Sequence, residues 1–161
     1  MRGGALPPAL LLAALAFVLA HASPRVRVWS LIALLGAITA LSQLALPGDW
    51  LETVFLGCWI STAGTAAAVH LPRGPGLVGG ILFALNAGFW AQAVVALSGT
   101  PHDLLAALAV VLLIVPAAWL VARGASIAVK VASSWLIAIA ILAAVLPFLP
   151  VTPGYLPDHL E

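Results

Sequence analysis

The feature that most constrains this chain is a series of six apolar runs, none of which contains an aspartate or a glutamate. They cover residues 5–22, 28–46, 53–70, 76–97, 104–122 and 129–149. About 20 apolar residues in a helix cross the roughly 30 Å of hydrocarbon in a bilayer, so each run predicts one transmembrane helix. Barrel strands would alternate apolar and polar residues, whereas these runs are continuously apolar. The pattern therefore predicts an all-α polytopic integral membrane protein, a compact bundle of six transmembrane helices.

Short turns rich in proline, glycine and charge separate the runs, which forces consecutive helices to pack antiparallel. Of the 161 residues, 64% are hydrophobic, against roughly 45–50% in soluble domains. This composition excludes a water-soluble globule. We interpret residues 1–149 as one six-helix transmembrane domain. Residues 150–161 repeat proline too often to continue a helix, so we expect an extended C-terminal tail there.

The first run also fits a secretory signal peptide. Arg2 precedes it, and Ala20-His21-Ala22 at its end matches a cleavage site between small residues. We interpret the run as a helix of the bundle, although the sequence leaves open whether it is ever processed.

An internal repeat is a further hypothesis. At an offset of 76 residues the first three runs overlay the last three, so that Trp59 meets Trp135 and residues 67–69 meet residues 143–145. A three-helix unit repeated once is inverted in the membrane, which is a common transporter plan. An alanine-rich chain also matches itself by chance, so the 3+3 inverted repeat stays open.

Basic residues indicate the orientation, because Lys and Arg in short loops are retained in the cytoplasm. Arg2 and all five acidic residues fall on one side of the predicted bundle. The turns on the other side carry the remaining five cations, a predicted cytoplasmic basic belt of Arg25, Arg27, Arg73, Arg123 and Lys130. We therefore expect a protein of a bacterial-type inner or plasma membrane with both termini on the non-cytoplasmic side.

The third and fourth runs hold most of the polarity expected inside the membrane. Four side chains of the third run share one helix face through their spacing of i, i+3, i+4 and i+7: Cys58, Ser61, Thr62 and Thr65. Asn86 lies midway along the fourth run, so it can meet that face near the bilayer midplane. Gly36, Thr39, Ser42 and Gln43 form a second stripe on the second run. We predict a polar seam of Ser61, Thr62, Thr65, Asn86, Thr39 and Gln43, with Phe83, Phe89 and Trp90 as its constriction.

Two interpretations of this seam remain open. Small and polar residues let membrane helices approach closely, and their interhelical hydrogen bonds contribute about 0.6 kcal/mol each. The same donors and acceptors can replace the lost hydration of a small neutral solute along a narrow path. We favour packing.

The sequence favours no catalytic, cofactor-binding or metal-binding site. The spans lack the acids that acid–base catalysis or ion-coupled transport would use. Residues 96–99, ALSG, lack the first glycine of the GxSG motif of rhomboid proteases, and no histidine follows in the last run. His21 and His70 end two helices on the same side, where paired haem ligation would be conceivable. Their place at the lipid–water boundary favours solvated side chains instead.

Two further classes are disfavoured. The lone cysteine, Cys58, is expected to act as a small packing residue. A formal net charge of +1 provides no basic face for nucleic acid.

We therefore predict a non-catalytic integral membrane subunit that packs with partner membrane proteins, or with itself, in a larger membrane complex. The alternative is a small channel or facilitator for an uncharged polar solute along the seam. A solute-binding subunit of a vitamin-type importer is weaker, since such subunits keep their termini in the cytoplasm. The sequence names neither the partners, the substrate nor the oligomeric state.

Overall fold

The computed structural model describes residues 4–72 and 74–149, and the regular structure in these residues is helical. The α-helices are α1 (Leu6–Ala20), α2 (Pro24–Leu41), α3 (Leu51–Ala67), α4 (Leu77–Ser98), α5 (Pro101–Ala109), α6 (Ile114–Ala122) and α7 (Ser126–Val145). Short 3-10 turns extend α3 at both ends (Gly48–Trp50 and Ala68–His70), join α5 to α6 (Val110–Leu113) and follow α7 (Leu146–Phe148). The predicted all-helical fold is confirmed.

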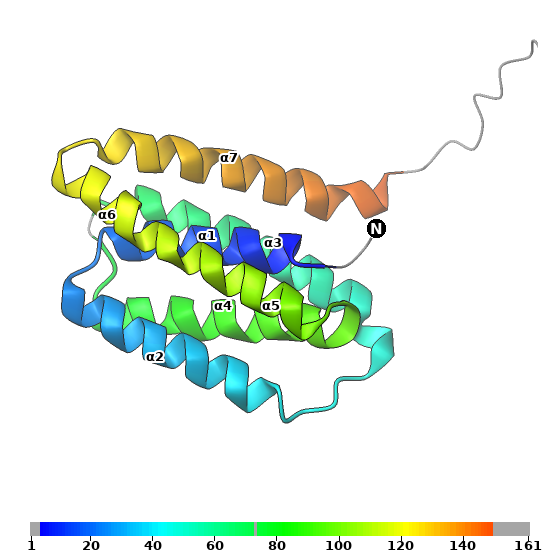
Figure 1. Cartoon of the computed structure of the whole chain (residues 1–161). Helices are drawn as coiled ribbons and strands as arrows, with labels where there is room; N and C mark the ends of the chain where they lie inside the picture. Colours follow the sequence, from blue (N-terminus) through cyan, green and yellow to red (C-terminus); the bar gives the residue numbers. More distant parts are fainter. Residues whose placement is uncertain (1–3, 73, 150–161) are drawn as a thin grey trace, which may run out of the picture.

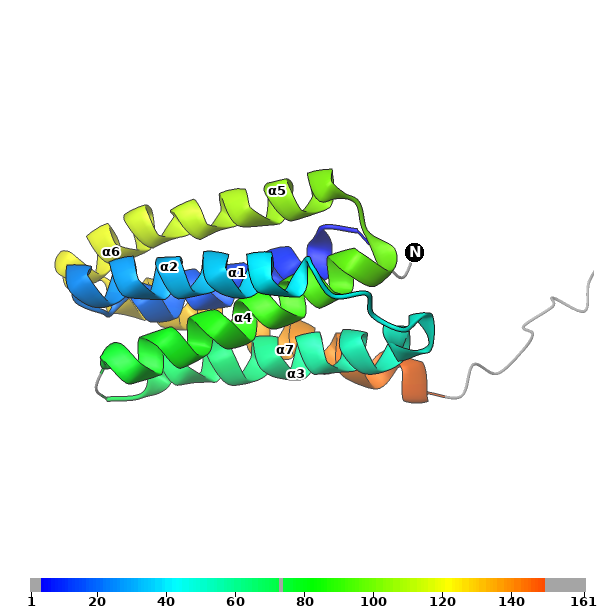
Figure 2. The ribbon, with the colours of Figure 1, turned by 90° about the horizontal axis from the view of Figure 1, so that it is seen from below.

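Helices α5 and α6 and the 3-10 turn between them follow one another in the same direction and form one continuous rod, and each other α-helix is a rod by itself. Consecutive rods run antiparallel in a single bundle (Figures 1 and 2). The turns after α1, α3 and α6 lie at one end, which we call the basic end because it carries Arg25, Arg27, Arg123 and Lys130. The turns after α2 and α4 lie at the other end, which we call the acidic end because it carries Asp49, Glu52 and Asp103. The start of α1 and the end of α7 both lie at the acidic end.

Four helices of the described residues are long and apolar enough to cross a membrane: Pro24–Leu41, Leu77–Ser98, Pro101–Ala122 and Ser126–Phe148. The other two predicted crossings are shorter. Helix α1 has 15 residues, and α3 has 17 and carries threonines and Glu52. At 1.5 Å per residue α1 is about 22 Å long, less than the thickness of the hydrocarbon core. The membrane-spanning criterion is thus met by four of the six expected helices.

Local capping explains why two helices begin earlier than expected. The hydroxyl of Ser23 accepts a hydrogen bond from the backbone N–H of Val26, and Pro24 follows, so α2 begins at residue 24 and not at 28. Thr100 and Asp103 form a reciprocal capping box, which starts α5 at Pro101 and not at 104.

The centre of the bundle is α1, which packs against α3, α4, α5 and α6. Its leucines at positions 11, 12, 15 and 19 are completely buried. A helix that is apolar all round has no face suited to water, and it is stable where neighbours surround it. The run that also fits a signal peptide therefore lies at the centre of the hydrophobic core of this fold.

The inverted-repeat hypothesis is met only in part by the helix contacts. The α2–α4 contact has its counterpart in the packing of α1 against α5 and α6, as the repeat requires. The contact between α1 and α3 has no counterpart of similar extent between α4 and α7. The repeat stays a prediction.

The tail at residues 150–161, Arg2 and Arg73 lie outside the described residues.

Candidate functional site in the polar contact between α3 and α4

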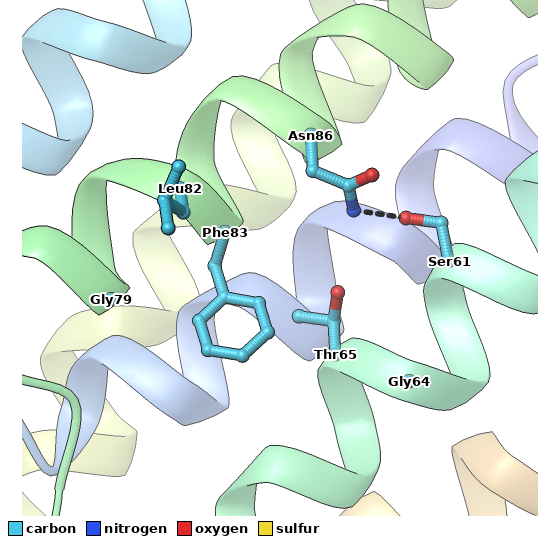
Figure 3. A pocket seen from close by; sticks show the side chains of 7 residues that line it. All are labelled: Ser61, Gly64, Thr65, Gly79, Leu82, Phe83 and Asn86. Carbon is cyan, nitrogen blue, oxygen red and sulfur yellow. Dashed lines mark hydrogen bonds between the residues drawn. The ribbon is translucent and has the colours of Figure 1, made fainter.

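Asn86 connects α4 to α3 through its side-chain amide. The amino group donates a hydrogen bond to the hydroxyl of Ser61, and the two side chains point toward one another in Figure 3. The amide oxygen accepts a hydrogen bond of 3.1 Å from the indole nitrogen of Trp90. An indole N–H can only donate, so this contact identifies the amide oxygen and directs the amino group toward Ser61. The three side chains form one hydrogen-bonded chain between the helices.

A glycine on α3 makes room for this chain. The ring of Trp90 lies against Gly57, where any Cβ would overlap the indole. Phe89 packs edge-on against Trp90, with ring centroids 5.1 Å apart and an interplanar angle of 87°, and is itself exposed. The predicted aromatic constriction is therefore not a ring around one path, because Trp90 covers α3 while Phe89 faces outward.

Beside the Asn86–Ser61 contact, a groove of about 490 Å³ opens between α3 and α4 (Figure 3). Leu82 and Gly64 at its rim are exposed, so the groove opens to the side of the bundle. A Cβ added at Gly64 would meet no atom within 4 Å. The groove is lined by Ser61, Gly64, Thr65, Gly79, Leu82, Phe83 and Asn86.

The two threonines of the seam have different surroundings. Thr62 is completely buried, and its hydroxyl donates to the carbonyl oxygen of Cys58 at 2.8 Å. Thr65 is 1% exposed and lines the groove, but its hydroxyl oxygen has no partner among the described residues. Ser61, Thr65, Asn86 and Phe83 therefore meet at the groove, while the hydroxyl of Thr62 is used within α3.

The second predicted stripe does not reach the seam. Thr39 on α2 and Gln43 just after the end of α2 are both exposed. The Thr39 hydroxyl donates to the carbonyl oxygens of Leu35 and Gly36, and the Gln43 amide donates to Ser42, so both side chains bond within their own segment. Helix α2 packs on α4 through a different face, which turns this stripe to the outside.

Two of the basic residues of the predicted belt make specific contacts within the bundle. The guanidinium of Arg27 donates to the carbonyl oxygens of Leu19 and Ala20, at 3.0 Å each, and so caps the C-terminus of α1. The Arg123 guanidinium lies 4.1 Å from the ring centroid of Trp119. Arg25 is exposed, and Lys130 is half-buried at the start of α7.

The two boundary histidines have separate partners. The Nδ1 of His21 donates to the carbonyl oxygen of Phe17 at 3.1 Å, and the Nε2 of His70 lies 3.4 Å from the hydroxyl of Ser134. In the described ranges, no group of three or more His, Cys, Asp or Glu residues is placed to hold a metal ion.

Sequence reasoning missed a buried hydrogen bond between α7 and α3. Ser133 on α7 is completely buried, and its hydroxyl donates to the carbonyl oxygen of Ala66 on α3 at 2.6 Å. The signal was available, because Ser133 and Ser134 interrupt an otherwise apolar run. Helix α3 is thus hydrogen-bonded to α4 on one side and to α7 on the other.

Comparison with known protein families, characterised proteins and solved structures finds no match to this chain. Its function is therefore inferred from its own geometry.

Proposed function

We propose that this chain is a non-catalytic integral membrane subunit that packs with partner membrane proteins, or with other copies of itself, in a larger membrane complex. The observation that carries this proposal is the position of Trp135. It lies midway along α7 and is 71% exposed on the outer face of the bundle. An indole N–H in the middle of the hydrocarbon has no water to bond, whereas tryptophan is common at membrane interfaces, where water is near. A protein partner over α7 would cover this ring.

The exposed residues of α7 around Trp135 form an apolar stripe with the spacing of a helix-packing surface. Ile127, Val131, Ile139 and Leu142 are exposed with it and recur every three or four residues. The internal polar contacts support the same function, since the bonds from Asn86 and Ser133 join helices to each other. A rigid bundle with an apolar outer stripe is suited to positioning partners in the membrane.

We infer that six rods cross the membrane, including the two shorter ones. Helix α1 is enclosed by its neighbours, so they, and not α1, meet most of the lipid. Helix α3 and its flanking 3-10 turns run without interruption from Gly48 to His70. The basic end is proposed to face the cytoplasm of a bacterial-type inner membrane, with both chain ends on the non-cytoplasmic side.

Orientation is tested by cysteine labelling in a Cys58→Ala background. A cysteine at Ser126, at the basic end, should react with a membrane-impermeant maleimide only after the cytoplasmic side is opened. A cysteine at Asp49, at the acidic end, is the matched control and should react in intact cells. The reverse pattern would contradict the proposed orientation.

Association is tested with the full chain in mild detergent. Trp135→Ala should weaken its association with the partner, or with a second copy, by about tenfold or more, since buried tryptophans dominate interface energies. Trp29→Ala on α2, where the ring is 49% exposed, is the matched control and should have little effect. The readouts are native mass spectrometry and co-purification. A wild-type chain that stays monomeric and alone, both here and after cross-linking in membranes, would exclude the proposal.

The second candidate function is a small channel or facilitator for an uncharged polar solute, which the groove at Ser61, Thr65 and Asn86 favours. Its lateral opening and the outward position of Thr39 and Gln43 make it the weaker candidate. Asn86→Leu distinguishes the two in liposome-swelling assays with neutral solutes. Solute flux should collapse in a channel, whereas a packing subunit gives no flux in either form.

A further inference from the structure

The groove between α3 and α4 contains more hydrogen-bond donors than the bundle uses. The Asn86 amino group has two protons, of which one goes to Ser61. Ser61 accepts that bond, and its own proton has no acceptor within the described part of the chain. The Thr65 hydroxyl at the floor of the groove has no partner there either. Three protons in one place therefore have no acceptor within the described residues, that of Thr65 being carried by a buried oxygen.

The remaining walls of the groove are apolar and uncharged. Phe83, Leu82 and two glycines complete the lining, and none of the lining residues is ionisable. A charged headgroup would have no counter-charge in this groove, and burying an unpaired charge is costly. An occupant should therefore be neutral and mostly apolar. It should also carry a hydrogen-bond acceptor, because water does not satisfy polar groups in the bilayer core.

We propose that the α3–α4 groove binds an uncharged, membrane-dissolved amphiphile with a long apolar chain, whose carbonyl oxygen accepts hydrogen bonds from Asn86 and Ser61. The apolar chain of this ligand lies between Leu82 and Phe83. The ligand enters from the side of the bundle, where Gly64 leaves the groove open. Trp90 holds the Asn86 amide so that its amino group faces Ser61. The Thr65 hydroxyl, which is buried and has no partner among the described residues, is a third donor at this place. Two classes of membrane compound share this chemistry: isoprenoid quinones and neutral glycerolipid esters.

Binding is tested with the full chain in dodecyl maltoside, a detergent that has no carbonyl group to compete. The probes are a benzoquinone with a decyl tail, dioleoylglycerol, and octadecane as a chain without oxygen, each radiolabelled for a scintillation proximity assay. At least one carbonyl probe should bind saturably, and octadecane should not. Competition between the two carbonyl probes identifies the source class. Equal binding of octadecane, or no saturable binding of either carbonyl probe, would overturn the proposal.

Two variants locate the site, and a third is the control. Gly64→Leu places a side chain in the open groove and should abolish saturable binding, while Gly36→Leu on the outer face of α2 should leave it unchanged. A Cβ at either glycine meets no atom within 4 Å, so both variants should fold. Thr65→Val keeps the shape but removes a proton, and it should weaken binding about fivefold. Normal binding by Gly64→Leu would overturn the assignment.

The same Gly64→Leu protein is examined for association with partners. If this variant no longer associates with partners and the wild type binds no probe, the groove binds a helix of a partner protein, and its assignment as a site for a membrane amphiphile is wrong. The proposed subunit function is tested separately at Trp135, on α7, so the two proposals fail through different measurements.

Discussion

Helix α4 packs on α2 and on α3 by two different means. Toward α2 it presents small residues, since Gly80, Ala84 and Gly88 are all buried. A Cβ at Gly88 would lie 2.8 Å from the carbonyl oxygen of Leu34 and 2.9 Å from the Cβ of Ala37, so the two backbones are nearly in contact. Toward α3 it presents Phe83, Asn86 and Trp90. The Asn86 amide joins the two helices by its hydrogen bond to Ser61, Trp90 holds that amide from within α4, and a groove lies beside them.

The difference between these two contacts indicates that one serves helix packing and the other serves binding. Small residues in a membrane interface give close van der Waals contact over the whole length of a helix. An interface of larger polar and aromatic side chains holds the helices through a few bonds and leaves unused donors between them. We infer that the α2–α4 contact carries stability, whereas the α3–α4 contact gives up part of its packing for a place where something else can bind.

The strongest test of this comparison is Gly88→Leu. The side chain has no room against Leu34 and Ala37, so α2 and α4 must separate, and overpacking of this kind costs about 3 kcal/mol. We expect a large fall in the thermal midpoint in detergent, followed by the fluorescence of a dye that reacts with exposed cysteine. Gly36→Leu, on the opposite face of α2, should unfold close to wild type. Similar midpoints for both variants would show that the α2–α4 contact is not tight.

Asn86→Leu tests the other side of α4 and should have a smaller effect. It removes the interhelical bond to Ser61 and the bond to Trp90 within α4, and side-chain hydrogen bonds between membrane helices contribute about 0.6 kcal/mol each. We expect a loss of about 1 kcal/mol in the free energy of unfolding, measured by denaturant titration in mixed micelles. Ser61→Ala removes one of the two bonds and should lose about half as much. A loss as large as that of Gly88→Leu would mean that the polar contact also carries the fold.

The sequence was sufficient for some of these features and not for others. Periodicity placed Ser61 on the face that meets Asn86, because helical spacing determines which side chains share a stripe and the short turn makes the two helices neighbours. It could not place Thr39, because whether α2 turns that stripe toward α4 depends on the glycines of α4, which the pattern of α2 does not contain. The central position of α1 was also unpredictable, since all six runs are rich in apolar residues and only packing decides which one is enclosed. Arg27 was expected only as part of the basic belt, and the turn after α1 brings its side chain back onto the end of that helix.

Thr65→Val should have the smallest effect on the ligand-free protein. The Thr65 hydroxyl is buried without a partner in the described residues. The native state is therefore destabilised by the desolvation of this hydroxyl and gains no hydrogen bond from it. Replacing it by a methyl group of the same shape should leave the free energy of unfolding unchanged or raise it slightly. A loss of about 1 kcal/mol would reveal a hydrogen bond inside the bundle, and Thr65 would then belong to the packing of α3 and not to the groove. A stable Thr65→Val protein that binds the carbonyl probe more weakly than wild type would instead show that the hydroxyl is kept for a molecule outside the chain.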